Sequence, residues 1–331
     1  MTSALQNEFY EAIREAQTLL QNENEWVDRY KKYAKDIAAN IEYIKKIRGT
    51  FCEWSPLKLY LNTSNAKSTS KTVRFELRYL GQTVADLICK ESPKLDTKKY
   101  DETNKRDFDC EVALTNADWK GKGAQDFRKH FKSRLTARNA NGKKSNEEHR
   151  LESLLLTEFS KNKSKEKVLL GIQPVKIAKV RFPMPTPLSA SKHNKVKYSG
   201  AFGGGIDILT RVRTADKSIN LCIMELKDEN TKKEPPKDAV KQAITYATFI
   251  RELLRSESGE EWWKIFGFRR KLPDELVLLA ACVMPSIAND DKSFANLALD
   301  IYDNKGEDKI LLHYLYFTEK NNEITGIDTS L

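Results

Sequence analysis

The chain has no long hydrophobic run. Among its 331 residues the longest uninterrupted one, Leu276–Met284, has nine residues. A membrane-spanning helix needs about 20, so a transmembrane protein is excluded and no membrane partner is expected. Charged side chains stand where a secretory signal would need an apolar core, at Glu8, Glu11, Arg14 and Glu15. Export is therefore not expected, and the sequence predicts a cytoplasmic protein.

Cysteine and histidine are too few and too scattered to frame a fold or bind zinc. The five cysteines are an odd number without a CxxC pair, and the four histidines show no metal-ligand spacing. We expect reduced thiols, as is usual for a cytosolic protein. No helix-turn-helix or zinc-finger signature is present, so the sequence does not reveal a recognition site for nucleic acid.

What the chain does have is concentrated positive charge. Hydrophobic residues make up 40% and charged residues 31%, which is a globular composition, and the net charge is +10. Residues 117–200 hold 20 Lys and Arg against 7 Asp and Glu, a net +13, while the rest of the chain sums to −3. Such clustering suits a polyanionic partner, because each neutralised phosphate releases counterions.

Within this basic segment, residues 124–137 predict an amphipathic helix. Phe127, Phe131 and Leu135 recur every four residues. The other faces carry Arg128, Lys129, Lys132 and Arg134. Contact with nucleic acid and a plain surface helix are equally good interpretations of this pattern.

The N-terminal part, residues 1–145, reads as an accessory region that is first helical and then rich in strands. Helical spacing covers residues 4–48, with a polar break at 21–25 and a stop at Gly49. Strands at 71–80 and 83–89 flank a turn at Gly81-Gln82. We expect residues 91–108 to form a loop and residues 111–114 a short strand.

Residues 146–331 predict an α/β core with a mixed sheet. The expected order is helix, strand, strand, strand, helix, strand. The expected elements are a helix at 147–159, an interrupted strand at 168–182, a proline-rich turn at 184–187, strands at 196–198, 206–212 and 219–227, a helix at 237–255, a buried strand at 275–284 and a hairpin of 310–317 with 323–327.

Three charged residues lie where a strand would normally avoid charge. Asp207 follows three glycines, 203–205, and Glu225 and Lys227 flank Leu226 at the end of an apolar strand. Buried charge is costly unless it is paired or bound to a metal. Residues two apart in a strand share a face. If Asp207 is on the adjacent strand, two carboxylates and one ammonium group converge.

This trio suits phosphodiester hydrolysis. Two carboxylates and a backbone carbonyl suit Mg²⁺, for which Mn²⁺ often substitutes. The metal lowers the pKa of a bound water, and a lysine beside it orients the attacking water. The Glu-x-Lys spacing alone is weak, because it recurs at 307–309 in an expected polar turn. The three glycines allow either the close approach of a phosphate to the backbone or the start of a strand with a bulge.

The combined pattern Gly205-Ile206-Asp207, Glu225-Leu226-Lys227 and Gln242-x-x-x-Tyr246 resembles the PD-(D/E)XK nuclease superfamily, which includes restriction endonucleases. The resemblance covers residues 146–285 and implies a restriction-endonuclease-like α-β-β-β-α-β core with a mixed sheet. The family's proline before the aspartate is an isoleucine in this chain.

The resemblance also implies roles for the matching residues. Asp207, Glu225 and the Leu226 carbonyl would be metal ligands, and Lys227 would position the water. Gln242 and Tyr246 resemble the RecB-like branch, in which this pair lies close to the DNA and the catalytic site.

Many members of the superfamily carry a further glutamate near the metal, on the helix before the first strand. Glu152 matches this position best, because Leu155 and Phe159 follow it at three and seven residues. Glu148, one turn earlier, is the alternative. Either glutamate is equally compatible with a charge on the surface of a helix.

The leading hypothesis is a Mg²⁺-dependent DNA endonuclease of a restriction or phage-defence system that acts on double-stranded DNA. Such enzymes often act as homodimers, because duplex target sites have two-fold symmetry. One alternative is a repair or processing nuclease that requires DNA ends or particular structures. Another is a catalytically inactive nucleic-acid-binding module on a nuclease fold.

Overall fold

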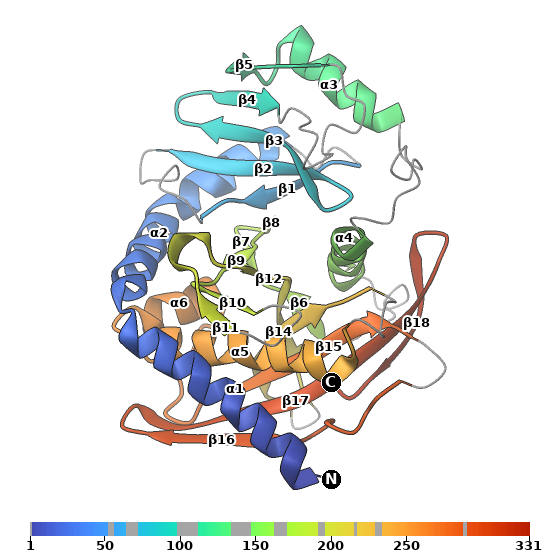
Figure 1. Cartoon of the computed structure of the whole chain (residues 1–331). Coiled ribbons are helices and arrows are strands. Elements are labelled where there is room, and N and C mark those ends of the chain that lie inside the picture. The colour runs from blue at the N-terminus through green and yellow to red at the C-terminus, as the bar shows by residue number, and fades with distance from the viewer. Residues whose placement is uncertain are drawn as a thin grey trace. The chain divides into compact units, whose positions relative to one another are not determined.

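The computed structural model is a mixed α/β protein, as the sequence predicts, and it forms two compact units (Figure 1). It describes residues 2–51, 56–63, 72–97, 112–133, 147–161, 171–190, 196–214, 217–228, 234–286 and 290–331. The first unit comprises Met1–Lys35, Leu154–Val175 and Pro183–Leu331, and the second comprises Asp36–Ser153 and Lys176–Phe182. A domain boundary at residues 145/146 stays a prediction. None of the helices in the described ranges is long and apolar enough to cross a membrane.

The first unit is built on a mixed sheet with the strand order β16-β17-β15-β14-β13-β6. Strand β18 pairs with the C-terminal part of β17. Strand β13 is antiparallel to both neighbours, whereas β14, β15 and β17 run parallel. The apolar run of β15 lies at the centre, where both faces are buried. The strands are β6 (Ile172–Pro174), β13 (Ile208–Arg213), β14 (Ile219–Leu226), β15 (Val277–Pro285), β16 (Ala298–Asp303), β17 (Gly306–Lys320) and β18 (Glu323–Thr329).

Helix α5 (Pro236–Leu254) packs on β14 and β15, and α1 (Thr2–Asn22) packs on α5. Proline at the start of α5 is favourable, because the first helical N–H groups have no partner within the helix. Almost all of α5 is buried between its neighbours. The unit also contains α6 (Gly259–Ile265), the short helix η1 (Gly200–Phe202) and the start of α2 (Glu25–Phe51).

Two small antiparallel ribbons precede the central strands. Strand β9 (Met184–Pro185) pairs with β12 (Gly205–Ile206), and β10 (Leu188–Ala190) pairs with β11 (Val196–Tyr198). The proline-rich turn expected at 184–187 is therefore wrong in its first half, because Met184 and Pro185 form a strand that pairs with β12.

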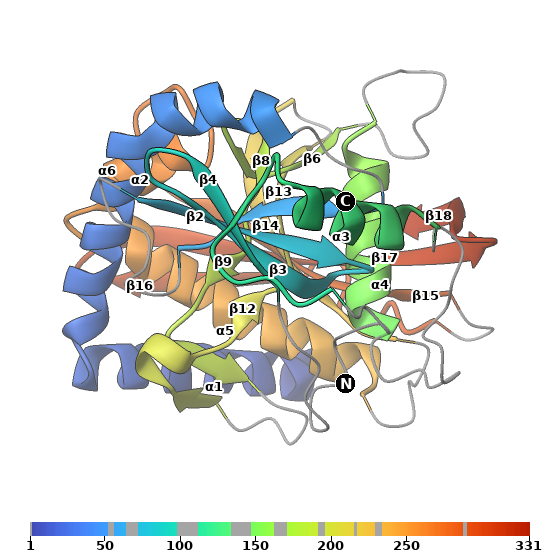
Figure 2. The same ribbon diagram turned by 90° about the horizontal axis from the view of Figure 1, so that it is seen from above.

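The second unit has its own sheet, in the order β5-β4-β3-β2-β1-β8-β7. Helix α3 packs on it through Phe131, whose ring lies 5.0 Å from that of Tyr79. Figure 2 looks down on these strands and on α3. The elements are β1 (Lys58–Leu61), β2 (Val73–Tyr79), β3 (Gln82–Cys89), β4 (Pro93–Thr97), β5 (Ala117–Asp118), β7 (Lys176–Ile177), β8 (Val180–Arg181) and α3 (Lys122–Ser133). Helix α4 (Glu147–Phe159) is divided between the units, with its residues up to Ser153 in the second and those from Leu154 in the first.

Several expectations about the second unit are wrong. Helix α2 continues past Gly49 to Phe51. The β2–β3 turn falls at Leu80-Gly81, which both have positive φ, and not at 81–82. In the described part of the expected loop 91–108, residues 91–97, the chain forms β4, which begins with a proline, a position where a strand needs no N–H donor. Residues 98–108 lie outside the described residues. Residues 112–114 form no strand.

The expected strand at 168–182 is also wrong in its described part. It consists of three short strands, of which β6 joins the sheet of the first unit and β7 and β8 join that of the second. The turn between β7 and β8 holds Ala178 and Lys179 at positive φ, a sharp reversal that the side-chain pattern does not reveal. The helices at 147–159 and 237–255, the strands at 219–227 and 275–284 and the C-terminal hairpin are confirmed.

Candidate active site

Asp207 interrupts the strand that the sequence predicts at 206–212. The chain forms β12 before it and β13 after it. Ile208 pairs with Met224 on β14, so Asp207 lies one position further, beside Glu225. The Asp207 Oδ2 accepts a hydrogen bond of 2.9 Å from the Leu226 N–H. Asp207 is thus placed next to Glu225 and held by the backbone of the adjacent strand.

Glu225 and Lys227 lie side by side at the end of β14, as the alternation of a strand predicts. The Lys227 Nζ donates a 2.8 Å hydrogen bond to Glu225 Oε1, and the two side chains are only 10% and 6% exposed. The Lys227 N–H donates to the Val283 carbonyl of β15, which fixes the backbone here. Burying this pair is costly, which makes a purely stabilising role a weak explanation for it.

Gln242 and Tyr246 lie one turn apart on α5 and are 3% and 4% exposed. Burial raises the pKa of the Tyr246 hydroxyl, and the negative charges of Glu225 and Asp207 raise it further. Tyr246 therefore stays protonated and lies within the electrostatic reach of both carboxylates.

The side-chain amide nitrogen of Gln242 donates no hydrogen bond within the described part of the chain. Its Nε2 is buried, and no acceptor for it is found in the described part of the chain. A buried donor without an acceptor costs about 1–3 kcal/mol. Such a donor, one turn from Tyr246 on α5, is suited to bind a ligand oxygen.

The three glycines before Asp207 serve contacts within the chain. A Cβ on Gly203 would lie 1.9 Å from the Thr186 carbonyl oxygen, and a Cβ on Gly204 would lie 3.2 Å from the Tyr246 hydroxyl. Gly205 is exposed and open. The close approach at the first two glycines is therefore made by the protein's own backbone and by Tyr246.

Sequence reasoning missed the strand segment 184–190 that makes these contacts. Two prolines in Met184-Pro185-Thr186-Pro187 are typical of a turn, and no hydrophobic alternation marks the segment as a strand. It also missed Cys282, which pairs in register with Glu225. Burial raises the pKa of the Cys282 thiol, and the charge of Glu225 raises it further. Cys282 therefore stays protonated and unreactive beside Glu225.

Glu152 belongs to the second unit. Its carboxylate is 9% exposed and lies 4.0 Å from Arg78 Nη1 and 3.7 Å from His149 Nδ1. Arg78 is itself fixed by two hydrogen bonds to Glu76 and by the ring of Tyr60, 4.2 Å below it. The role of Glu152 as a metal ligand stays a prediction, and so does the choice between Glu152 and the half-buried Glu148.

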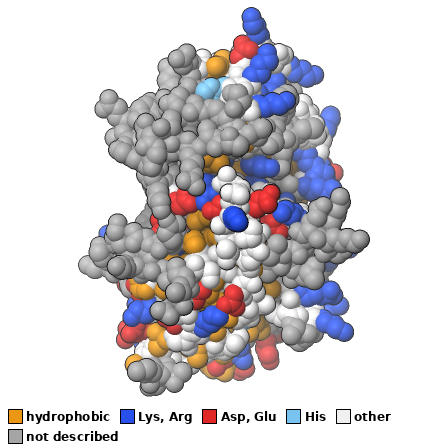
Figure 3. All heavy atoms as spheres, turned by 90° about the vertical axis from the view of Figure 1, so that its right-hand side faces the viewer, with side chains coloured by type: hydrophobic (Ala, Val, Ile, Leu, Met, Phe, Trp, Pro, Cys, Tyr) orange, Lys and Arg blue, Asp and Glu red, His pale blue; other side chains and the backbone are white. Residues whose placement is uncertain are grey.

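The basic helix α3 buries its apolar stripe, as the pattern predicts, but one of its basic residues is buried too. Arg128 lies 4.2 Å from the ring of Trp119 and donates a 2.7 Å hydrogen bond to its carbonyl. Lys129 and Lys132 are exposed. Figure 3 shows Lys and Arg side chains gathered at the top of the view, where α3 lies. Leu135 and Arg134 lie outside the described residues.

The oxygen atoms of Asp207, Glu225 and Leu226 are the ligands that the sequence suggests for Mg²⁺. In the described ranges no group of three or more His, Cys, Asp or Glu side chains is placed to hold an ion. Mg²⁺ needs fewer protein ligands, because it keeps several waters and uses one or two carboxylates together with substrate phosphates. Asp207, Glu225 and the Leu226 carbonyl therefore fit Mg²⁺ by their chemistry, and a thiolate- or imidazole-bound metal is a poorer fit.

Known proteins offer no guide to this site. No protein-family model, no curated protein and no solved structure matches the chain.

Proposed function

We propose that the chain is a Mg²⁺-dependent DNA endonuclease of the PD-(D/E)XK type that serves a restriction or phage-defence system in the cytoplasm. The observation that carries the proposal is the group formed by Asp207, Glu225 and Lys227 at the end of β14. In this group, Asp207 accepts a hydrogen bond from the Leu226 N–H, and Lys227 donates one to Glu225.

The order of the elements supports the same proposal. If only the strands of the first unit's sheet are counted, α4 is followed by β6, β13, β14, α5 and β15, while β7–β12, η1 and α6 are inserted between them. This reduced order is compatible with the helix–three strands–helix–strand order of a restriction-endonuclease-like core. An antiparallel second strand and a parallel third and fourth strand are also compatible with that mixed sheet.

The residues divide the chemistry among themselves. Asp207, Glu225 and the Leu226 carbonyl would hold Mg²⁺, which supplies an activated water and charge for the developing oxyanion. Lys227 remains close enough to orient the attacking water once it is released from Glu225. The Gln242 amide would donate to a phosphate oxygen, and burial of the group would strengthen each of these interactions.

Double-stranded DNA is the proposed substrate, and the second unit offers a surface for it. Lys129 and Lys132 of α3 are exposed, whereas Arg128 supports the helix from inside. Exposed lysines bind phosphates without reading sequence, so α3 would contribute affinity more than specificity. A homodimer on a symmetric site remains part of the proposal.

The test is incubation of supercoiled plasmid with the protein in Mg²⁺ or in EDTA. We expect cleavage only with Mg²⁺, and we expect Asp207→Asn to slow it by at least about 100-fold, because a charge-stabilising group at the reacting centre is lost. Asp300→Asn is the matched control, since Asp300 is a partly exposed aspartate paired with Lys309 at 3.4 Å, away from the site. Full cleavage by Asp207→Asn would overturn the assignment.

The same assay separates a second candidate, an end-dependent processing nuclease. The buried Gln242–Tyr246 pair beside the carboxylates favours it, because this spacing is typical of RecB-like enzymes. Such an enzyme digests linear DNA and spares closed circles. Tight Mg²⁺-independent binding without cleavage of either form would instead indicate an inactive binding module.

A further inference from the structure

A short ribbon of backbone delivers the chain to Asp207. We call residues 184–190 and 203–206 the glycine ribbon. Its two strands are joined by the pairing of β9 with β12 and by hydrogen bonds at Gly204. The Gly204 carbonyl accepts from the Thr186 N–H at 3.0 Å, and the Gly204 N–H donates to the Leu188 carbonyl at 3.2 Å. Asp207 is the next residue after the ribbon, so the ribbon sets where its backbone lies.

The Tyr246 hydroxyl touches both strands of this ribbon from α5. It accepts a hydrogen bond from the Ala190 N–H at 3.2 Å. On the other strand, Gly204 approaches so closely that a Cβ there would be 3.2 Å from the hydroxyl oxygen. Tyr246 is 4% exposed, so water cannot easily replace this contact.

Asp207 is fixed from the opposite direction by β14. Its carboxylate accepts a hydrogen bond from the N–H of Leu226, the residue between Glu225 and Lys227 at the end of β14. The position of Asp207 therefore depends on two anchors. One is the strand that carries its partner, and the other is the ribbon that α5 holds.

We propose that Tyr246 is a positioning residue that holds the glycine ribbon against α5 and thereby fixes Asp207 opposite Glu225. The effect on cleavage rests on the proposed function, whereas the effect on the ribbon does not. Loss of the hydroxyl leaves the half-buried Ala190 N–H without this acceptor and opens space beside Gly204. The ribbon then moves, and Asp207 moves with it.

The first experiment measures the ribbon directly, by hydrogen–deuterium exchange and mass spectrometry. Tyr246→Phe should exchange faster than the wild-type protein in peptides covering 184–190 and 203–208. Tyr198→Phe is the matched control, because Tyr198 lies on β11 and its hydroxyl bonds Glu25 at 3.2 Å on the exposed side. It should leave 203–208 unchanged. Unchanged exchange of 203–208 in Tyr246→Phe overturns the proposal.

The second experiment tests the contact with Gly204 by a double-mutant cycle on thermal unfolding. Gly204→Ala places its Cβ against the hydroxyl, so it should cost less stability in the Tyr246→Phe background than in the wild type. Gly203→Ala should cost the same in both backgrounds, because its Cβ would clash with the Thr186 carbonyl instead. Additive effects of Gly204→Ala and Tyr246→Phe overturn the contact on which the proposal depends.

The third experiment connects the ribbon to the site. Tyr246→Phe should bind Mn²⁺ more weakly by calorimetry and should lower kcat by about 10- to 100-fold with little change in KM, as expected for a misplaced group. Unchanged Mn²⁺ binding and unchanged kcat overturn the positioning role. If the wild-type protein neither binds Mn²⁺ nor cleaves DNA, the proposed function is wrong, and exchange of 203–208 alone decides the proposal.

Discussion

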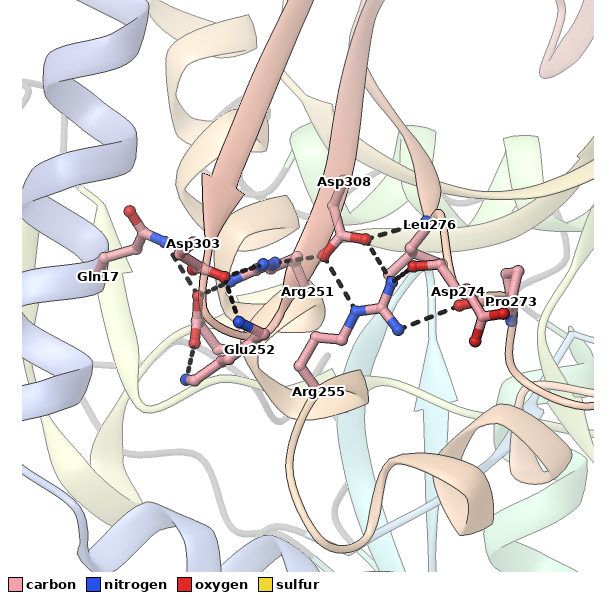
Figure 4. Close-up of polar contacts among 10 residues, drawn as sticks. Gln17, Arg251, Glu252, Arg255, Pro273, Asp274, Leu276, Asp303 and Asp308 are labelled. Atoms are coloured by element: carbon pink, nitrogen blue, oxygen red, sulfur yellow. Dashed lines mark hydrogen bonds and ion pairs between the residues drawn. The ribbon is translucent and has the colours of Figure 1, made fainter.

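Helix α5 carries two buried polar clusters that differ in how fully their hydrogen bonds are satisfied. Near its C-terminal end, the guanidinium of Arg251 is 0% exposed and is surrounded by carboxylates (Figure 4). It bonds Asp308 at 2.6 Å, Glu252 at 2.8 Å and Asp303 at 2.6 and 2.7 Å. Nearer its N-terminal end, Tyr246 lies within the electrostatic reach of Asp207, Glu225 and Lys227, and Gln242, one turn away, presents a buried donor with no described acceptor.

The difference separates structure from function. A buried charge that is fully hydrogen-bonded holds elements together, and the Arg251 cluster joins α5 to β16 and β17 and, through Gln17, to α1. A buried polar group that lacks a partner lowers stability, and binding of a ligand is one way to satisfy it. The same helix therefore anchors the fold at one end and presents the candidate site at the other.

Replacing Arg251 should give the largest effect of this comparison. Arg251→Leu leaves Glu252, Asp303 and Asp308 without their shared cation, and removing one member of a buried ion pair costs about 3–5 kcal/mol. Urea unfolding should show this loss. Lys305→Ala is the control, because Lys305 also pairs with Glu252 but is 39% exposed, and it should cost at most about 1 kcal/mol. Equal unfolding midpoints for Arg251→Leu and the wild type would remove the distinction between the clusters.

The Arg251 cluster should also set a pH dependence of stability. The hydrogen bond from Arg251 lowers the pKa of Asp303. At Asp308, burial raises the pKa, but the hydrogen bonds from Arg255, Leu276 and Arg251 outweigh burial, so the pKa of Asp308 is lowered too. A carboxyl group with a lowered folded pKa adds stability above its unfolded pKa of about 3.9 and loses it as pH falls through the folded value.

Unfolding in urea between pH 6 and pH 2 measures this effect. The wild-type protein should lose more stability below about pH 4 than Asp308→Asn, which lacks one of the two titrating groups. Parallel pH profiles for the two proteins would mean that Asp308 does not contribute to acid stability.

The sequence predicted the candidate site better than the Arg251 cluster, and the reason is the range of the interactions. Asp207, Glu225 and Lys227 converge through strand alternation and the pairing of neighbouring strands, which are local rules. Arg251 meets Asp303 and Asp308 across 52 and 57 residues, which no pattern in the chain reveals. The polar turn expected at 307–309 is wrong for the same reason, because the segment lies in β17 with Asp308 buried.

Arg128 and Tyr246 show the same limit on single side chains. Spacing placed Arg128 on a polar face of its helix, but Trp119, just before the helix, covers it. Spacing placed Tyr246 on the face of α5 toward the site, but its partner Ala190 lies 56 residues away in a segment without a strand pattern. Periodicity predicts which way a residue faces, and only the fold determines what it meets there.

The smallest expected effect is also the sharpest test of the comparison. Gln242→Leu replaces a buried amide that lacks an acceptor by an apolar group of similar size, so the free energy of unfolding should stay constant or rise by about 1 kcal/mol. Binding of duplex DNA in Ca²⁺, measured by fluorescence anisotropy, should weaken severalfold. Thr248→Val is the matched control, since Thr248 is on the same helix and its hydroxyl is satisfied by the Ile244 carbonyl at 2.9 Å.

The control should lose about 1 kcal/mol of stability and bind DNA normally. If Gln242→Leu instead loses stability as Thr248→Val does and keeps its DNA affinity, Gln242 belongs with Arg251 among the structural residues of α5. A gain in stability together with a loss of binding would place the amide in the site, because residues that serve binding are often retained at a cost in stability.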